Sequence, residues 1–195
     1  MGMPMFTGVL ALLERSLRMD IRDRWSHGFR VAAVLVGYGA MAIAAEQSRF
    51  FGAPGLMFFQ SLVWLNALLI ALAGVGYFAS VITEEKEEGT LGLMQMTGLS
   101  GLGILLGKFG SRLLQAGLLV LLQIPFALLG ITLGGVTLPQ VAAMITALLA
   151  SLFLTANLAL LTSVVSRNTR QAAFRMTLIV VGYVVLFWIA DELMG

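Results

Sequence analysis

The protein has 195 residues, of which 59% are hydrophobic and only 11% are charged, whereas a soluble domain carries about 25% charged residues. Together with the mean hydropathy of +0.95, this composition excludes an ordinary water-soluble core. The formal net charge of +2 provides no basic field for nucleic acid. Because the chain has no cysteine, disulfides, thiolate nucleophiles and cysteine-based metal sites are excluded as well.

Residues 1–30 are predicted to form a cytoplasmic, amphipathic helix at the membrane surface. Apolar residues recur there at helical spacing, and Arg15, Arg18 and Arg22 occupy much of the remaining surface. A basic face of this kind binds the lipid headgroup region, so these three arginines are candidate membrane-surface anchors. An ordinary surface helix is the alternative interpretation.

Residues 31–195 are predicted to form one transmembrane domain with an all-α, polytopic fold. Uncharged apolar stretches predict five spans, at about 31–45, 56–82, 113–133, 139–165 and 176–190, because a span needs about 20 apolar residues. Pro125 is expected to kink the third span near Gln123. With five spans, the chain stops where a sixth, returning helix is expected.

The distribution of lysine and arginine predicts the orientation. With the N-terminus in the cytoplasm, the inside segments hold every one of the twelve basic residues except Arg49. The reversed topology would place a single basic residue inside. We therefore expect a multi-pass protein of the inner, or cytoplasmic, membrane with a cytoplasmic N-terminus.

The spans contain no ionisable residue, whereas ion-coupled transporters normally keep such groups there to bind the coupling ion. The energy source is therefore expected on another chain. The stretch 103–109 resembles a phosphate loop but has three rather than four residues between its glycines, and His27 has no partner for a metal site. We expect no catalytic residue, metal or cofactor in this chain. The uncharged polar residues of the spans are expected to join helices or to line a path: Gln60, Asn66, Gln115, Gln123 and Asn157.

The loop predicted at 83–112 begins with an acidic run, in which Glu84, Glu85, Glu87 and Glu88 surround Lys86. On a helix several of these carboxylates share a face. Like charges so close together gain most when a basic partner surface neutralises them. The alternative is a solvated helix end, in which acidic residues favourably occupy the first turn.

The same loop resembles the cytoplasmic loop of type 2 ABC transporter permeases, the membrane subunits of exporters. The pattern is Glu-Glu-Gly-Thr-Leu at 87–91, then Thr-x-Leu-Ser, then Ile-Leu-Leu-Gly-Lys, and it includes Gly89, Thr90, Thr97, Ser100 and Lys108. More diffuse similarity covers nearly all of the chain. Two departures are Gly98, where the family often has proline, and the missing sixth span.

The resemblance implies that this chain is not an enzyme but the permease subunit of an ABC exporter. A coupling helix containing Glu84, Glu85, Glu87, Glu88, Gly89 and Thr90 would dock on a separate cytoplasmic ATPase subunit, which would hold ATP and Mg. Lys108 and Arg112 are further candidate membrane-surface anchors. The expected partners are that ATPase, a second permease in a homodimer or heterodimer, and membrane lipid, without nucleic acid.

Three alternatives remain open from the sequence. A permease of the haem-exporter kind used in cytochrome maturation has a comparable loop. A membrane scaffold or assembly protein would use the acidic loop to bind another soluble factor. A passive channel would be compatible with the uncharged polar residues of the spans.

Overall fold

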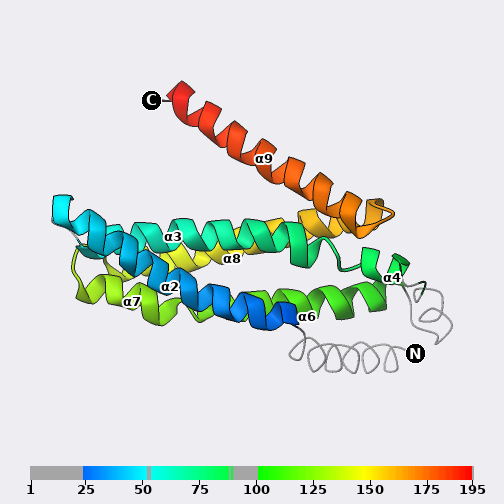
Figure 1. Cartoon of the computed structure of the whole chain (residues 1–195), viewed down its shortest axis with the longest axis horizontal. Coiled ribbons are helices and arrows are strands. Elements are labelled where there is room, and N and C mark those ends of the chain that lie inside the picture. The colour runs from blue at the N-terminus through cyan, green and yellow to red at the C-terminus, as the bar shows by residue number, and fades with distance from the viewer. Residues whose placement is uncertain (1–23, 52–53, 88, 90–100, 195) are drawn as a thin grey trace.

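The structure, a computed structural model, describes residues 24–51, 54–87, 89 and 101–194. Within these ranges every regular element is a helix, which confirms the all-α prediction (Figure 1). The elements are α2 (Arg24–Phe51), α3 (Pro54–Ala73), the π-helix η1 (Gly74–Phe78), α4 (Thr83–Glu87), α6 (Gly101–Leu121), α7 (Ile124–Thr132), α8 (Leu138–Val165) and α9 (Thr169–Met194).

In the part of the chain that the structure describes, four helical stretches are long and apolar enough to cross a membrane, which indicates a membrane protein. They are Pro54–Phe78, Gly107–Thr132, Leu138–Val165 and Thr169–Leu186, and they correspond to the second to fifth predicted spans. The first predicted span, 31–45, lies within α2, whose apolar stretch Val31–Glu46 is shorter than the other four. At 1.5 Å per residue this stretch does not cover a hydrocarbon core of about 30 Å. Five spans therefore remain a prediction.

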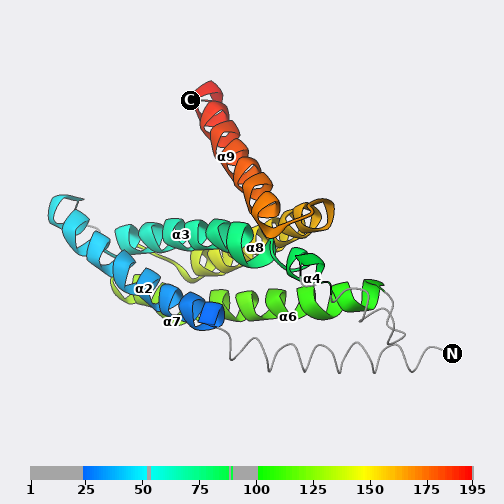
Figure 2. The ribbon, with the colours of Figure 1, turned by 45° about the vertical axis from the view of Figure 1, so that its right-hand side comes forward.

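The helices pack as a bundle from which α9 diverges. In Figures 1 and 2, α3, α6 and α8 run side by side, whereas the far end of α9 lies well away from them. The core contains Phe58 and Leu62 of α3 together with Leu148 and Leu152 of α8. Only 11% of the apolar window of α9 is buried, against 33% for the span that contains α3. Most of the surface of α9 is therefore available to lipid or to another chain.

The predicted break near Pro125 is confirmed, because α6 ends at Leu121 and α7 begins at Ile124. Proline has no backbone N–H, so it cannot continue the hydrogen-bond ladder of the helix. Beside the break, the Gln123 side-chain amide donates a 2.8 Å hydrogen bond to the Ala33 carbonyl of α2. This polar residue joins two helices, as expected for one of the uncharged polar residues of the spans.

The tight turn between α7 and α8 requires glycine. Gly134 and Gly135 have φ values of +87° and +91°, a region that side chains with a Cβ rarely adopt. The start of α3 packs against this turn so closely that a Cβ on Gly55 would lie 1.9 Å from the carbonyl oxygen of Gly134. This contact fixes one end of α3 against the end of α7.

The structure differs from the predicted loop 83–112 in one respect. Residues 101–112 belong to α6 and continue without a break into the span. Each glycine costs a helix only about 1 kcal/mol relative to alanine, and the neighbouring leucine, isoleucine and lysine residues favour helix, so the glycines do not break it. Arg15, Arg18 and Arg22 of the predicted surface helix lie outside the described residues, as do Glu88 and Thr90. Residues 24–30 of that prediction belong to α2 and continue without a break into residues 31–51.

Candidate functional site

The end of α3 changes from an α-helix to the π-helix η1 before the chain turns into α4. The Ala79 N–H donates to the Gly74 carbonyl at 3.2 Å, an i to i+5 hydrogen bond. π-helical turns occur frequently at functional sites because they widen the helix and redirect side chains. Within η1, Tyr77 reaches across to α6, where its hydroxyl donates to Gln115 Oε1 at 3.3 Å.

Arg112 of α6 joins this region to α4. One guanidinium nitrogen, Nη1, donates to the Tyr77 carbonyl and, at 2.9 Å, to the Ser80 hydroxyl. The other, Nη2, lies 2.8 Å from Glu84 Oε2, and the guanidinium carbon lies 4.9 Å from the centroid of the Tyr77 ring. The planar guanidinium group can make this fork of bonds and the ring contact together, which an ammonium group cannot do.

Lys86 binds the C-terminal end of α8. Its ammonium nitrogen donates to three backbone carbonyls, those of Ser163 at 3.2 Å, Val164 at 2.6 Å and Ser166 at 2.8 Å. The last carbonyls of a helix have no partner within the helix and carry partial negative charge. The lysine therefore caps α8 with both hydrogen bonds and a complementary charge.

Glu87 binds the N-terminal end of α9. Its carboxylate accepts hydrogen bonds from the Thr169 backbone N–H at 2.7 Å and from the Thr169 hydroxyl at 3.1 Å. A carboxylate is favourable at this position because the first N–H groups of a helix are unpaired and carry partial positive charge. The Thr169 hydroxyl also lies 3.1 Å from the Thr83 hydroxyl of α4.

Ser163 fixes the backbone where α4 begins. Its hydroxyl oxygen accepts from the backbone N–H groups of Ile82 at 3.0 Å and Thr83 at 3.3 Å. Ser163 and Thr83 are fully buried, and an unpaired buried N–H would cost about 1–3 kcal/mol. The bond therefore holds the start of α4 against α8 at a fixed position.

These contacts make one unit, which we call the α4 junction: Thr83, Glu84, Lys86 and Glu87 together with Arg112, Ser163, Ser166 and Thr169. Three side chains of the five-residue helix α4, those of Glu84, Lys86 and Glu87, bind three different helices. A displacement of α4 would act on α6, α8 and α9 together.

The structure gives the predicted acidic run more than one role. Glu84 and Glu87 bind other helices, with 43% of the Glu84 side chain exposed. Glu85 lies in α4, although its side chain is outside the described residues, and Gly89 has a φ of +69° that suits a turn. Lys108 is half-buried near the start of α6.

Two residues of the junction, Ser163 and Thr169, were not singled out from the sequence, and neither were Tyr77 and Ser80 beside it. From the sequence, Lys86 is a counter-charge within the acidic run and one of the inside basic residues that predict the orientation. The one available signal was the presence of small hydroxyl residues at the ends of apolar stretches, since serine and threonine often join helices in membranes. Their partners lie as many as 86 residues away in the sequence.

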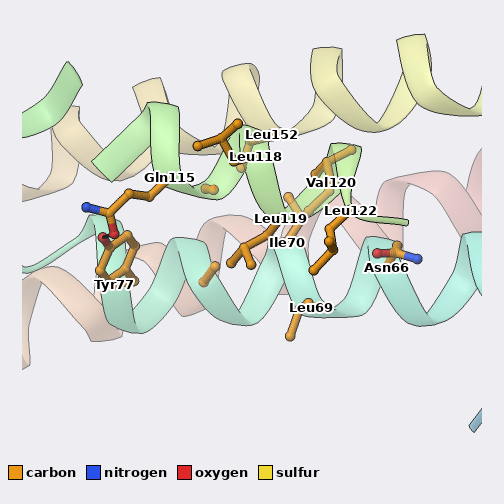
Figure 3. Close-up of a pocket in the computed structure, with 12 residues that line it drawn as sticks. Asn66, Leu69, Ile70, Tyr77, Gln115, Leu118, Leu119, Val120, Leu122 and Leu152 are labelled. Atoms are coloured by element: carbon orange, nitrogen blue, oxygen red, sulfur yellow. Dashed lines mark hydrogen bonds between the residues drawn. The ribbon is translucent and has the colours of Figure 1, made fainter. Parts of the chain in front are cut away.

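A cavity of about 240 Å³ lies beside the junction, between α3 and α6, with α8 behind it (Figure 3). Its walls are mainly leucine, isoleucine, valine and alanine. Two of the polar residues singled out in the sequence, Asn66 and Gln115, line it, as does Tyr77. Asn66 is 2% exposed and donates to the Leu62 carbonyl of its own helix at 2.9 Å.

The fold thus defines a helical membrane protein in which a short helix joins the ends of three longer ones. No protein-family model and no curated protein matches the chain. A function must therefore be inferred from the junction, the cavity and the sequence pattern.

Proposed function

We propose that this chain is the membrane-spanning permease subunit of an ABC exporter. A separate cytoplasmic ATPase would bind and hydrolyse ATP, and this chain would convert the resulting movement into passage of a substrate across the membrane. The α4 junction is the observation that carries the proposal. The similarity of residues 84–108 to the loop of type 2 ABC permeases supports it independently of the contacts.

A coupling element must be short, accessible at one end of the bundle and bonded firmly to the helices that it moves. The α4 helix has five residues and lies at the end of the bundle where α3 finishes and α6 begins (Figures 1 and 2). Its bonds run to α6 through Arg112, to α8 through Lys86 and to α9 through Thr169. Because these bonds combine charge with several hydrogen bonds, they resist small displacements.

In the proposed mechanism, ATP shifts the permease between inward-open and outward-open states. A ligand shifts such an equilibrium only as far as its affinity differs between the two states. The ATPase subunits would supply that difference by closing on ATP, and the α4 junction would transmit it to the spans. The permease itself would contribute no catalytic residue.

The proposal includes the membrane topology expected from the charges. The N-terminus and α4 would lie on the cytoplasmic side, and α2 would contribute a fifth span with the help of residues flanking Val31–Glu46. Two permease chains, identical or related, would form the translocation pathway. The exposed apolar surface of α9 supports a contact between two such chains.

Affinity purification from native membranes tests the proposal. The chain should co-purify with a phosphate-loop ATPase in equal amounts. The double variant Glu85→Lys/Glu88→Lys should lose the ATPase while inserting normally, because it changes the acidic run without removing the Glu84 and Glu87 bonds. Retention of the ATPase by this variant would contradict the docking assignment, and a soluble partner without ATPase activity would favour a scaffold instead.

A matched control separates docking from a general effect of charge. Arg167→Glu also reverses an exposed charge at this end of the bundle, but it lies outside the acidic run. It should leave co-purification unchanged. Equal loss of the ATPase in both variants would show that the effect is a general one of charge and not a property of the coupling segment.

A further inference from the structure

The cavity between α3 and α6 has the shape and the lining of a binding site for a hydrocarbon chain. It extends along α3 and η1 from Asn66 to Tyr77, a separation of eleven residues, or about 16 Å at 1.5 Å per residue. This length is about half of a hydrocarbon core of roughly 30 Å. The cavity is therefore a slot that reaches from the α4 end of the bundle to the middle of the spans.

The lining differs between the two ends of the slot. Along its length it is formed by apolar side chains such as Ile70 and Leu119, with Leu152 of α8 behind them. At the α4 end it is bounded by the Tyr77–Gln115 hydrogen bond, as the close-up in Figure 3 shows. At the other end lies Asn66, whose amide nitrogen donates to the Leu62 carbonyl of its own helix. A slot with apolar walls and a tyrosine–glutamine pair at the α4 end matches an amphiphile, whose tail is apolar and whose head is polar.

The volume limits the size of the occupant. About 240 Å³ is below the roughly 300–1,000 Å³ of pockets that hold drug-sized ligands. The slot therefore has room for one hydrocarbon chain and not for a whole two-chain lipid. Inside a membrane, hydrocarbon chains surround the protein, so a chain can enter the slot laterally from the bilayer.

The end of the slot is also connected to the α4 junction. The Tyr77 ring that bounds the slot contacts the Arg112 guanidinium, and Arg112 binds Glu84 of α4. Two contacts therefore separate the proposed coupling helix from the polar end of the slot. A displacement of α4 would change the position of Tyr77 relative to Gln115, and with it access to the slot from that end.

We infer that the slot between α3 and α6 binds the single hydrocarbon chain of an amphiphile, with its polar group at the Tyr77–Gln115 end and with Arg112 linking that end to α4. The inference gives the proposed exporter a substrate class, and it rests on the proposed function only for the direction of transport. Binding itself requires no ATPase, so the two ideas can fail separately.

Photolabelling of the full chain tests the inference. A fatty acid that carries a diazirine in its chain is added to the protein in detergent, and the labelled peptides are mapped by mass spectrometry. The label should be concentrated in the peptides containing Asn66–Ala73 and Gln115–Leu122. A second arm uses a phosphatidylcholine with the same diazirine, which distinguishes a free single-chain amphiphile from one chain of a bilayer lipid.

The variant Ala116→Trp fills the slot, whereas Leu114→Trp adds the same side chain at an exposed position of α6 outside it. Labelling by at least one probe should fall at least fivefold in the first variant and stay within twofold in the second. If Ala116→Trp does not fold, Ala73→Leu fills the slot from the opposite wall. Labelling that is spread over the exposed helix faces, or that is equal in all variants, would overturn the inference, as would cross-linking of the slot to a second copy of the chain.

Discussion

Replacing Arg112 tests the α4 junction, because this side chain joins η1, α4 and α6. Its side chain is 12% exposed, and it binds the Tyr77 carbonyl, the buried Ser80 hydroxyl and Glu84. A hydrogen bond to a charged group contributes about 1.5–3 kcal/mol. The bond to Glu84 counts for less, about 0.5 kcal/mol, because 43% of the Glu84 side chain is exposed to solvent.

Arg112→Ala removes all these bonds and the contact with the Tyr77 ring, which adds about 0.5–1 kcal/mol. Contacts made by one side chain are not additive, so their separate contributions overestimate the loss. We expect the free energy of unfolding to fall by about 2–4 kcal/mol. At about 2–4 °C per kcal/mol for a chain of this size, the apparent Tm should drop by roughly 5–15 °C. Arg112→Lys should recover only part of the loss, since a lysine cannot form the fork and the ring contact together.

The assay is thermal unfolding of the purified protein in one detergent, followed by size-exclusion chromatography. Apparent Tm values are compared at a single heating rate, because membrane proteins commonly unfold irreversibly. The control is Arg167→Ala, at an exposed arginine, which should change the Tm by less than about 2 °C, as surface substitutions usually do. If Arg112→Ala is no more destabilising than this control, the junction does not hold the helices as described.

Three further substitutions test other contacts. Ser163→Ala leaves two buried backbone N–H groups without their acceptor and should lower the free energy of unfolding by about 1–3 kcal/mol. The control Ser151→Ala removes a hydroxyl that donates within its own helix, so it should lower the free energy of unfolding clearly less. Equal shifts in Tm for the two variants would contradict a special role of Ser163. Gly55→Ala should prevent correct packing, because its Cβ would lie 1.9 Å from a backbone oxygen, whereas Gly117→Ala meets nothing within 4 Å and should be tolerated in size-exclusion profiles. Lys86→Met removes the cap of α8, so hydrogen exchange at the end of α8 should accelerate, and unchanged protection there would exclude a capping role.

The sequence predicted the helical fold and the main spans well because these depend on local properties. A run of uncharged apolar residues identifies a span wherever it packs, and Pro125 interrupts a helix in any environment. The start of α6 at Gly101 was missed because glycines suggested a loop, although the cost of a glycine in a helix is small. The apolar stretch of α2, Val31–Glu46, is the opposite case, because it is helical and apolar but too short to be identified as a span by its length.

The site was less predictable because its bonds join distant parts of the chain. The acidic run could be located from the sequence, but Glu84 and Arg112 are 28 residues apart, and Glu87 and Thr169 are 82 apart. No local pattern indicates which carboxylate will cap a helix and which will meet a partner. The cavity is also a property of packing, because α3 and α6 enclose it only after α8 has positioned both.

ATP hydrolysis by the purified complex tests the central claim most directly. Material that co-purifies with the wild-type chain from its native membranes should hydrolyse ATP in the presence of Mg. That activity should be lost when Glu85 and Glu88 are reversed to lysine and the variant remains inserted in the membrane. A correctly folded wild-type chain that is isolated from native membranes without an ATPase, under conditions that preserve other membrane complexes, would contradict the assignment as an exporter subunit.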